Sequence, residues 1–172
     1  MAQKKDRDLN GSLSPQGALA ETLLPAQEGD VLELDEVWSF VGHKKNRVWL
    51  WFVLCRRTRQ IVAWMWGERD ALTAQDVWAK VPAQYKHCRC FADGLEAYAH
   101  AIPPDQLHQQ TQKQHTNHEE RFNATLRGRV GRLVRKTLSF SKNLFMHIVH
   151  LRLFLHTYNR DCARRYQASH QT

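Results

Sequence analysis

Apolar and polar side chains begin to alternate at residue 31, and this pattern divides the chain into predicted elements. The alternation over 31–41 predicts a strand, because successive side chains of a strand point to opposite faces. An apolar run over 48–55 is typical of a central strand that is buried on both faces. A third apolar segment follows at 61–66. The short polar turns between these segments predict an antiparallel meander.

Shorter elements follow, and several of them end at proline or glycine. The expected elements are a helix over 72–81, a strand over 88–92, a short helix over 95–102 and a strand over 107–110. Thr73 is the expected cap of the first helix, and Pro82 ends it. The strand over 88–92 ends at Asp93, directly before a glycine.

Two helices are expected after residue 117, because apolar side chains recur there at helical spacing. The first ends near Ser139, and the second covers about 142–159. The order of elements predicts an α/β fold of the RNase H-like class. This fold is a mixed five-stranded sheet that begins with three antiparallel strands, is flanked by helices and is followed by C-terminal basic helices. Function still has to be argued from sites, because one fold hosts many activities.

The chain of 172 residues has the size of one domain. We expect an arm or linker over 1–30, the RNase H-like domain with its basic helices over 31–160, and a tail over 161–172. The longest apolar run has eight residues, whereas a membrane-spanning helix needs about 20, so no such helix is expected. Residues 1–30 show no secretory signal and the cysteines are sparse, so a cytoplasmic location is expected.

Charge is distributed unevenly along the chain. The whole chain carries a formal charge of +8, but residues 121–172 contain eleven Lys and Arg and a single acid, Asp161. A basic segment of this kind predicts a polyanionic partner, usually nucleic acid. A solvated basic helix without a partner is the alternative.

Three carboxylate positions are candidates for chemistry. Asp35 lies within an apolar strand, where an ionised group is costly unless it is paired or bound to metal. Asp93 lies at a strand end, and Glu119 and Glu120 begin a helix. Three converging carboxylates are suited to Mg²⁺, with Mn²⁺ as a substitute, in phosphoryl transfer. Each also has an ordinary explanation: a hydrogen bond to a neighbouring strand, a turn, or a favourable charge at a helix start.

Three separated segments resemble the transposases of the insertion-sequence-one family, in the InsB-type reading frame. They are LDEVWSFVG, FADGLEAY and EERFNATLRGRVGRLVRKTLSFSK, and the resemblance covers about residues 32–159. It implies a Mg²⁺-dependent DDE transposase whose metal ligands are Asp35, Asp93 and Glu120. Glu120 fits because Arg121 and Arg127 stand one and seven positions after it. Helical periodicity places Glu119 nearer the apolar stripe, so it is the alternative third ligand.

The resemblance also implies partners. Double-stranded DNA is expected at the element's terminal inverted repeats and at the target, bound by a homo-oligomer. The expected phosphate-binding residues are Arg121, Arg127, Arg129, Arg132, Arg135, Lys136 and Lys142. No zinc-binding or helix-turn-helix segment is recognisable before residue 31, so an upstream-frame DNA-binding protein or fused domain is expected. The alternatives are a non-catalytic DNA-binding inhibitor and another RNase H-like nuclease.

Other chemistry-bearing residues have weaker interpretations. Cys88 and Cys90 lack the spacing of a structural zinc site and are expected to be buried thiols. His108, His115 and His118 precede or begin the long helix and are expected in a polar surface segment, although protonated histidine suits phosphate.

Overall fold

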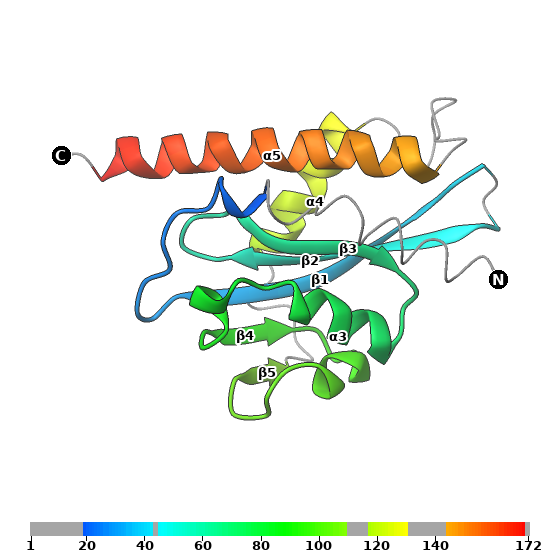
Figure 1. Ribbon diagram of the computed structural model, residues 1–172, viewed down its shortest axis with the longest axis horizontal. Coiled ribbons are helices and arrows are strands. Elements are labelled where there is room, and N and C mark those ends of the chain that lie inside the picture. Colours follow the sequence, from blue (N-terminus) through cyan, green and yellow to red (C-terminus); the bar gives the residue numbers. More distant parts are fainter. Residues whose placement is uncertain (1–18, 43–44, 110–116, 131–143, 171–172) are drawn as a thin grey trace.

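The sheet of the computed structural model has five strands in the order β3-β2-β1-β4-β5. The structure describes residues 19–42, 45–109, 117–130 and 144–170. The strands are β1 (Val31–Phe40), β2 (Arg47–Cys55), β3 (Ile61–Gly67), β4 (Arg89–Ala92) and β5 (Leu107–Gln109). The first three are antiparallel neighbours, whereas β4 pairs parallel with both β1 and β5 (Figure 1). The predicted α/β fold with a mixed, RNase H-like sheet is confirmed.

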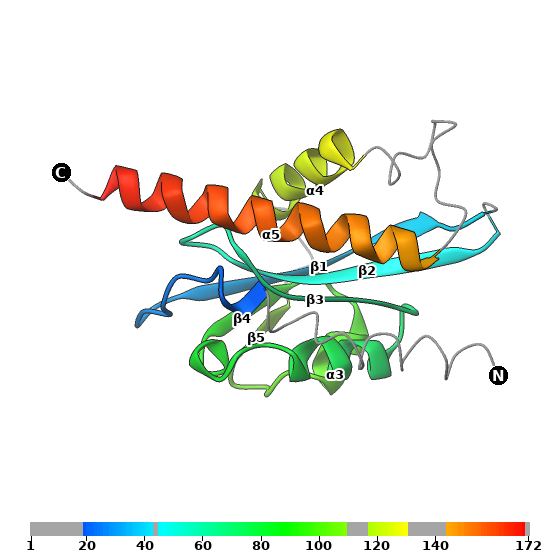
Figure 2. The ribbon, with the colours of Figure 1, turned by 45° about the horizontal axis from the view of Figure 1, so that its top comes forward.

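Helices cover both faces of this sheet, which explains why β3 and all of β2 after Arg47 are apolar. The helices are α3 (Ala71–Ala79), α4 (Asn117–Arg129) and α5 (Leu144–Ser169), with short 3₁₀ helices η1 (Ala83–Tyr85) and η2 (Glu96–His100). Figure 2 shows α4 and α5 on one side of the sheet and α3 on the other. Along β1, Leu34 therefore packs into one core, whereas Val37 packs into the second core beneath α4 and α5.

The start of α3 differs from the prediction. Asp70, not Thr73, is the cap: its Oδ1 accepts a hydrogen bond from the Thr73 backbone N–H at 2.8 Å. Thr73 is instead buried against Gly67: a Cβ added at Gly67 would lie 2.4 Å from Thr73 Cγ2. The sequence offers two capping residues three positions apart, and close packing against β3 decides between them.

The end of the chain also differs from the prediction. α5 continues to Ser169, well past the expected end near residue 159, so residues 161–169 are helical. Cys162 is buried in the second core, and this apolar contact continues the helix along the sheet. The remainder of the predicted basic helix between α4 and α5 lies outside the described residues.

Part of the predicted N-terminal arm is attached to the domain. Gln60 donates from Nε2 to the Thr22 carbonyl at 2.7 Å, and its Oε1 accepts from the Leu24 N–H at 2.9 Å. Asn159 of α5 donates to Thr22 Oγ1 at 3.0 Å. Residues 19–30 thus lie against the β2–β3 turn and α5.

Two further expectations concern membranes and thiols. Within the described residues, no helix combines the length and apolar character that crossing a membrane requires. All four cysteines are free and buried, as expected for Cys88 and Cys90.

Candidate active site

Strand pairing brings Asp35 and Asp93 together. Leu34 of β1 pairs with Ala92 of the parallel strand β4. Asp35 directly follows Leu34, and Asp93 directly follows Ala92. Burial raises the pKa of Asp35 above its usual value, and the negative charge of Asp93 raises it further. Asp35 is half-buried in β1, whereas Asp93 is exposed at the end of β4. The two carboxylates therefore form a pair on the neighbouring strands β1 and β4, where β4 ends.

Both oxygens of Asp35 accept hydrogen bonds. Oδ1 accepts from the Glu36 backbone N–H at 2.8 Å, and Oδ2 accepts from Asn123 Nδ2 at 2.8 Å. These bonds and the nearby charge of Arg127 favour the ionised carboxylate and oppose the effect of burial on its pKa. Sequence reasoning missed Asn123, although its amide lies four positions before Arg127 and therefore on the same side of α4.

Glu36 lies beside the aspartate pair, on the opposite face of β1 from Asp35. Its Oε1 accepts from Arg69 Nε at 2.8 Å and Nη2 at 2.7 Å, and its Oε2 accepts from the Tyr98 hydroxyl at 2.6 Å. Burial raises the pKa of Glu36, and the charges of Asp93 and Asp35 add to that rise. The only sequence signal for Glu36 was its position beside Asp35 in an apolar strand.

Arg69 connects Glu36 to the aspartate pair. Its Nη2 lies 3.7 Å from Asp93 Oδ2 while it also holds Glu36. The guanidinium is further placed over the Trp49 ring, 5.1 Å from the centroid. The positive charge of Arg69 thus lies between two acidic side chains from neighbouring strands, which lowers the free-energy cost of placing their negative charges close together.

The predicted third ligand, Glu120, is exposed on the first turn of α4. The side chains that the structure describes include no group of three His, Cys, Asp or Glu able to hold a metal ion. Asp35 and Asp93 are therefore together without Glu120, and the Glu119 side chain lies outside the described residues.

The predicted phosphate-binding residues are placed only in part. Arg127 lies near Asp35, Arg121 lines a pocket on another side of α4, and Arg129 Nη1 lies 3.9 Å from Asp161 Oδ2. The remaining four, Arg132, Arg135, Lys136 and Lys142, lie outside the described residues.

A mixed sheet with an aspartate pair on neighbouring parallel strands defines an RNase H-like protein with an acidic site. Among known families, the model described as IS1 transposase matches residues 31–159. The chain belongs to the IS1 transposase family, as its resemblance to the insertion-sequence-one family predicted.

Curated relatives agree with this membership. The chain is 35% identical to the insertion element iso-IS1n protein InsB of Shigella dysenteriae over 117 residues, which is 68% of this chain and 87% of that protein. It is also 35% identical to an insertion element IS1 protein InsB of Shigella flexneri, over 67% of this chain and 86% of that protein. An InsB protein of Escherichia coli K12 is 33% identical over 67% of each chain.

Proposed function

We propose that this chain is the catalytic protein of a bacterial insertion sequence. It cleaves DNA strands at the ends of the element and joins each freed 3′-OH to target DNA. The adjacency of Asp35 and Asp93 supports this proposal most directly, because paired carboxylates on neighbouring strands suit phosphoryl transfer. Family membership supports the reaction class.

The residues fit a hard divalent cation, Mg²⁺ or Mn²⁺, in their donor chemistry. Asp35 and Asp93 would hold it through carboxylate oxygens, and a cation would relieve the repulsion that raises the pKa of Asp35. Glu120 is the proposed third ligand, and Glu119 is the alternative. A cation held there would supply Lewis-acid activation of the attacking oxygen and charge stabilisation for the leaving oxygen of the phosphodiester.

Neighbouring side chains position the aspartate pair. Asn123 fixes the orientation of the Asp35 carboxylate, so a rigid helix and a central strand hold the same group. Arg69 holds Glu36 and reaches Asp93 from the side of α3. These contacts fix both carboxylates before DNA arrives, which reduces the ordering cost of the reaction.

DNA is the proposed partner, bound through backbone phosphates by the basic residues of α4 and of the segment after it. Arg121, Arg127 and Arg129 belong to the described part of this surface, and Arg132, Arg135, Lys136 and Lys142 are proposed members. Phosphate contacts position DNA without reading its sequence, so binding falls steeply with salt. Joining two element ends calls for at least two copies, and end recognition for an upstream-frame protein or fused domain. We expect a protein with this activity in the bacterial cytoplasm, associated with the nucleoid.

Nicking of supercoiled plasmid at low salt with Mn²⁺ tests the proposal. We expect the native chain and an Asp105→Asn control to nick, because Asp105 is exposed and precedes β5, at the opposite end of the parallel β4–β5 pair from Asp93. Asp93→Asn should not nick. Nicking that persists in Asp93→Asn would overturn the assignment. Nicking without joining of a 3′-OH end to a second duplex would indicate another RNase H-like nuclease, and DNA binding without nicking would indicate a non-catalytic inhibitor.

A further inference from the structure

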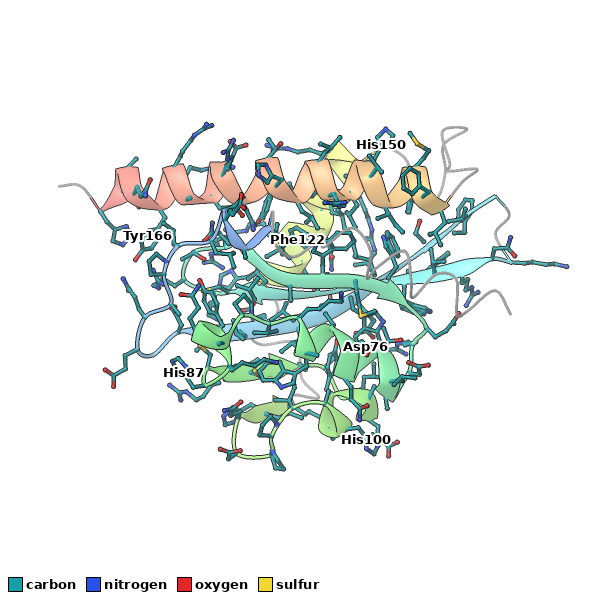
Figure 3. All side chains as sticks on the ribbon, viewed as in Figure 1. Asp76, His87, His100, Phe122, His150 and Tyr166 are labelled. Atoms are coloured by element: carbon teal, nitrogen blue, oxygen red, sulfur yellow. The ribbon has the colours of Figure 1, made fainter. Side chains whose placement is uncertain are left out.

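A second site lies on the far side of α4 from Asp35. It is a pocket of about 640 Å³ between the β2–β3 turn, α4 and the C-terminal half of α5. Leu54, Phe122 and Tyr158 provide apolar walls. Figure 3 shows Phe122 and Tyr166 beneath α5, toward the sheet. Cys162, Arg165, Tyr166, Ser169 and His170 also line it, and all five lie beyond the region that the family model matches.

The lining of this pocket is strongly basic. It includes five arginines, namely Arg57, Arg59, Arg121, Arg129 and Arg165, and none of the described lining residues is acidic. Asp30 neutralises Arg57 through bonds of 2.6 and 2.8 Å, and Asp161 lies 3.9 Å from Arg129. Among the described residues, no carboxylate forms an ion pair with the other three, Arg59, Arg121 and Arg165.

Two buried nitrogens of the lining have no hydrogen-bond partner within the described chain. They are Arg59 Nη1 and His118 Nδ1. Buried polar atoms are nearly always satisfied. The guanidinium nitrogens of arginine are always donors, so the unpartnered Arg59 Nη1 indicates a missing acceptor in this pocket. Arg59 is held firmly in the turn, where it adopts φ 62° and its carbonyl accepts from Cys162 Sγ at 3.7 Å.

The local potential supports the same conclusion. Burial lowers the pKa of Arg59, the nearby carboxylate of Glu33 opposes that shift, and the positive charge of Arg121 adds to it. An anion between these groups would offset their mutual repulsion, in a pocket whose apolar walls limit screening by water.

We propose that this pocket binds a phosphate group and that the phosphate belongs to the backbone of a DNA strand. The assignment to DNA rests on the proposed function. Arginine forks match phosphate oxygens in geometry, and several around one pocket are typical of phosphate recognition. Free phosphate and nucleotides share this chemistry and are the other possible sources.

The pocket and the aspartate pair lie along the same face of the sheet. Leu54 of the pocket pairs with Glu33, which precedes Asp35 by two residues, a step of about 7 Å along a strand. α4 spans both places, because Arg121 lines the pocket and Asn123 bonds Asp35. A DNA strand whose scissile phosphate is at Asp35 would therefore reach the pocket with a phosphate farther along its backbone.

DNA affinity of the full chain, measured by fluorescence anisotropy across a salt series in EDTA, tests this pocket. Arg165→Glu should weaken binding about tenfold. It should also reduce the slope of log affinity against log salt concentration by about one, the contribution of one phosphate contact. Arg160→Glu is the matched control, because Arg160 is exposed on the same helix and does not line the pocket. It should change affinity less than about twofold. Arg165→Lys should retain most of the affinity, and Arg59→Gln should repeat the loss if circular dichroism shows it folded.

The outcomes separate the pocket from the proposed reaction. Asp93→Asn should keep the Arg165-dependent DNA binding even where it abolishes nicking, so failure of one proposal leaves the other standing. Equal losses in Arg165→Glu and Arg160→Glu would overturn the pocket, as would no loss in either. Inorganic phosphate and dAMP are compared at matched ionic strength. If they stabilise the native chain more than Arg165→Glu while DNA affinity is unchanged, the DNA source is overturned in favour of a free ligand.

Discussion

Asn123 on α4 donates a hydrogen bond from Nδ2 to Oδ2 of Asp35 on β1, at 2.8 Å. This bond joins residues that are 88 positions apart in the chain. It fixes the helix that carries Glu119 and Glu120 against the strand that carries the first aspartate. The positions of Glu119 and Glu120 relative to Asp35 therefore depend on how α4 packs against β1.

Replacing Asn123 with alanine should reduce plasmid nicking about 10- to 100-fold, the usual cost of removing a group that orients a metal ligand. The hydrogen bond from Asn123 favours the ionised form of Asp35, so removing it should raise the pKa of Asp35 further. The acid side of the nicking pH profile would then move to higher pH. Asn46→Ala, in an exposed turn, is the control and should leave the profile unchanged. An unshifted profile would show that Asn123 does not act through Asp35.

Tyr98→Phe should lower the free energy of unfolding by about 1–2 kcal/mol, because Glu36 loses its hydroxyl donor while buried. The ring itself packs edge-on against Trp51 at 5.4 Å, and phenylalanine keeps that contact. Urea denaturation measures the difference. Combining Tyr98→Phe with Glu36→Gln should cost less than the sum of the two single changes. Additive losses would mean that the hydroxyl and the carboxylate are not coupled.

Sequence patterns predicted the part of the site that strand order determines. Alternation and apolar runs predicted the strands, and the resulting parallel pair places Asp35 beside Asp93. The residues that surround the pair could not be predicted in the same way. Arg69 and Tyr98 come from a loop and a 3₁₀ helix, and their contact with Glu36 depends on the packing of α3 and η2 against the sheet.

The end of α5 illustrates the same limit. Charged and polar residues after residue 159 weaken the apolar pattern, so periodicity predicts a helix end there. The helix continues because Cys162 packs into the second core and Tyr166 contacts the Arg57 guanidinium, 5.1 Å from the ring centroid. These are contacts with distant segments, and a local pattern carries no information about them.

Asn159→Ala should lower the free energy of unfolding by about 2–4 kcal/mol. The Asn159 side chain is fully buried, accepts from the Ile61 N–H at 2.8 Å and donates to the Ile61 carbonyl at 2.9 Å. Alanine would leave both backbone groups of Ile61 unsatisfied at the edge of the sheet. Urea denaturation is again the measurement, with Asn46→Ala as the exposed control. A loss no larger than that of the control would show that water replaces the amide.

The ion pair between Asp30 and Arg57 should make stability depend on pH in one direction. Burial alone would raise the pKa of Asp30, but hydrogen bonds from Arg57 and the Gln27 N–H outweigh burial and lower it below 3.8. A carboxyl whose pKa is lower in the folded state stabilises the fold above its unfolded pKa and loses that effect as pH falls. Asp30→Asn should therefore cost about 2–4 kcal/mol near neutral pH, and the difference from the native chain should shrink from about pH 5 to about pH 3. Denaturation at a series of pH values measures this difference, and a constant difference would show that the ionised pair is not its source.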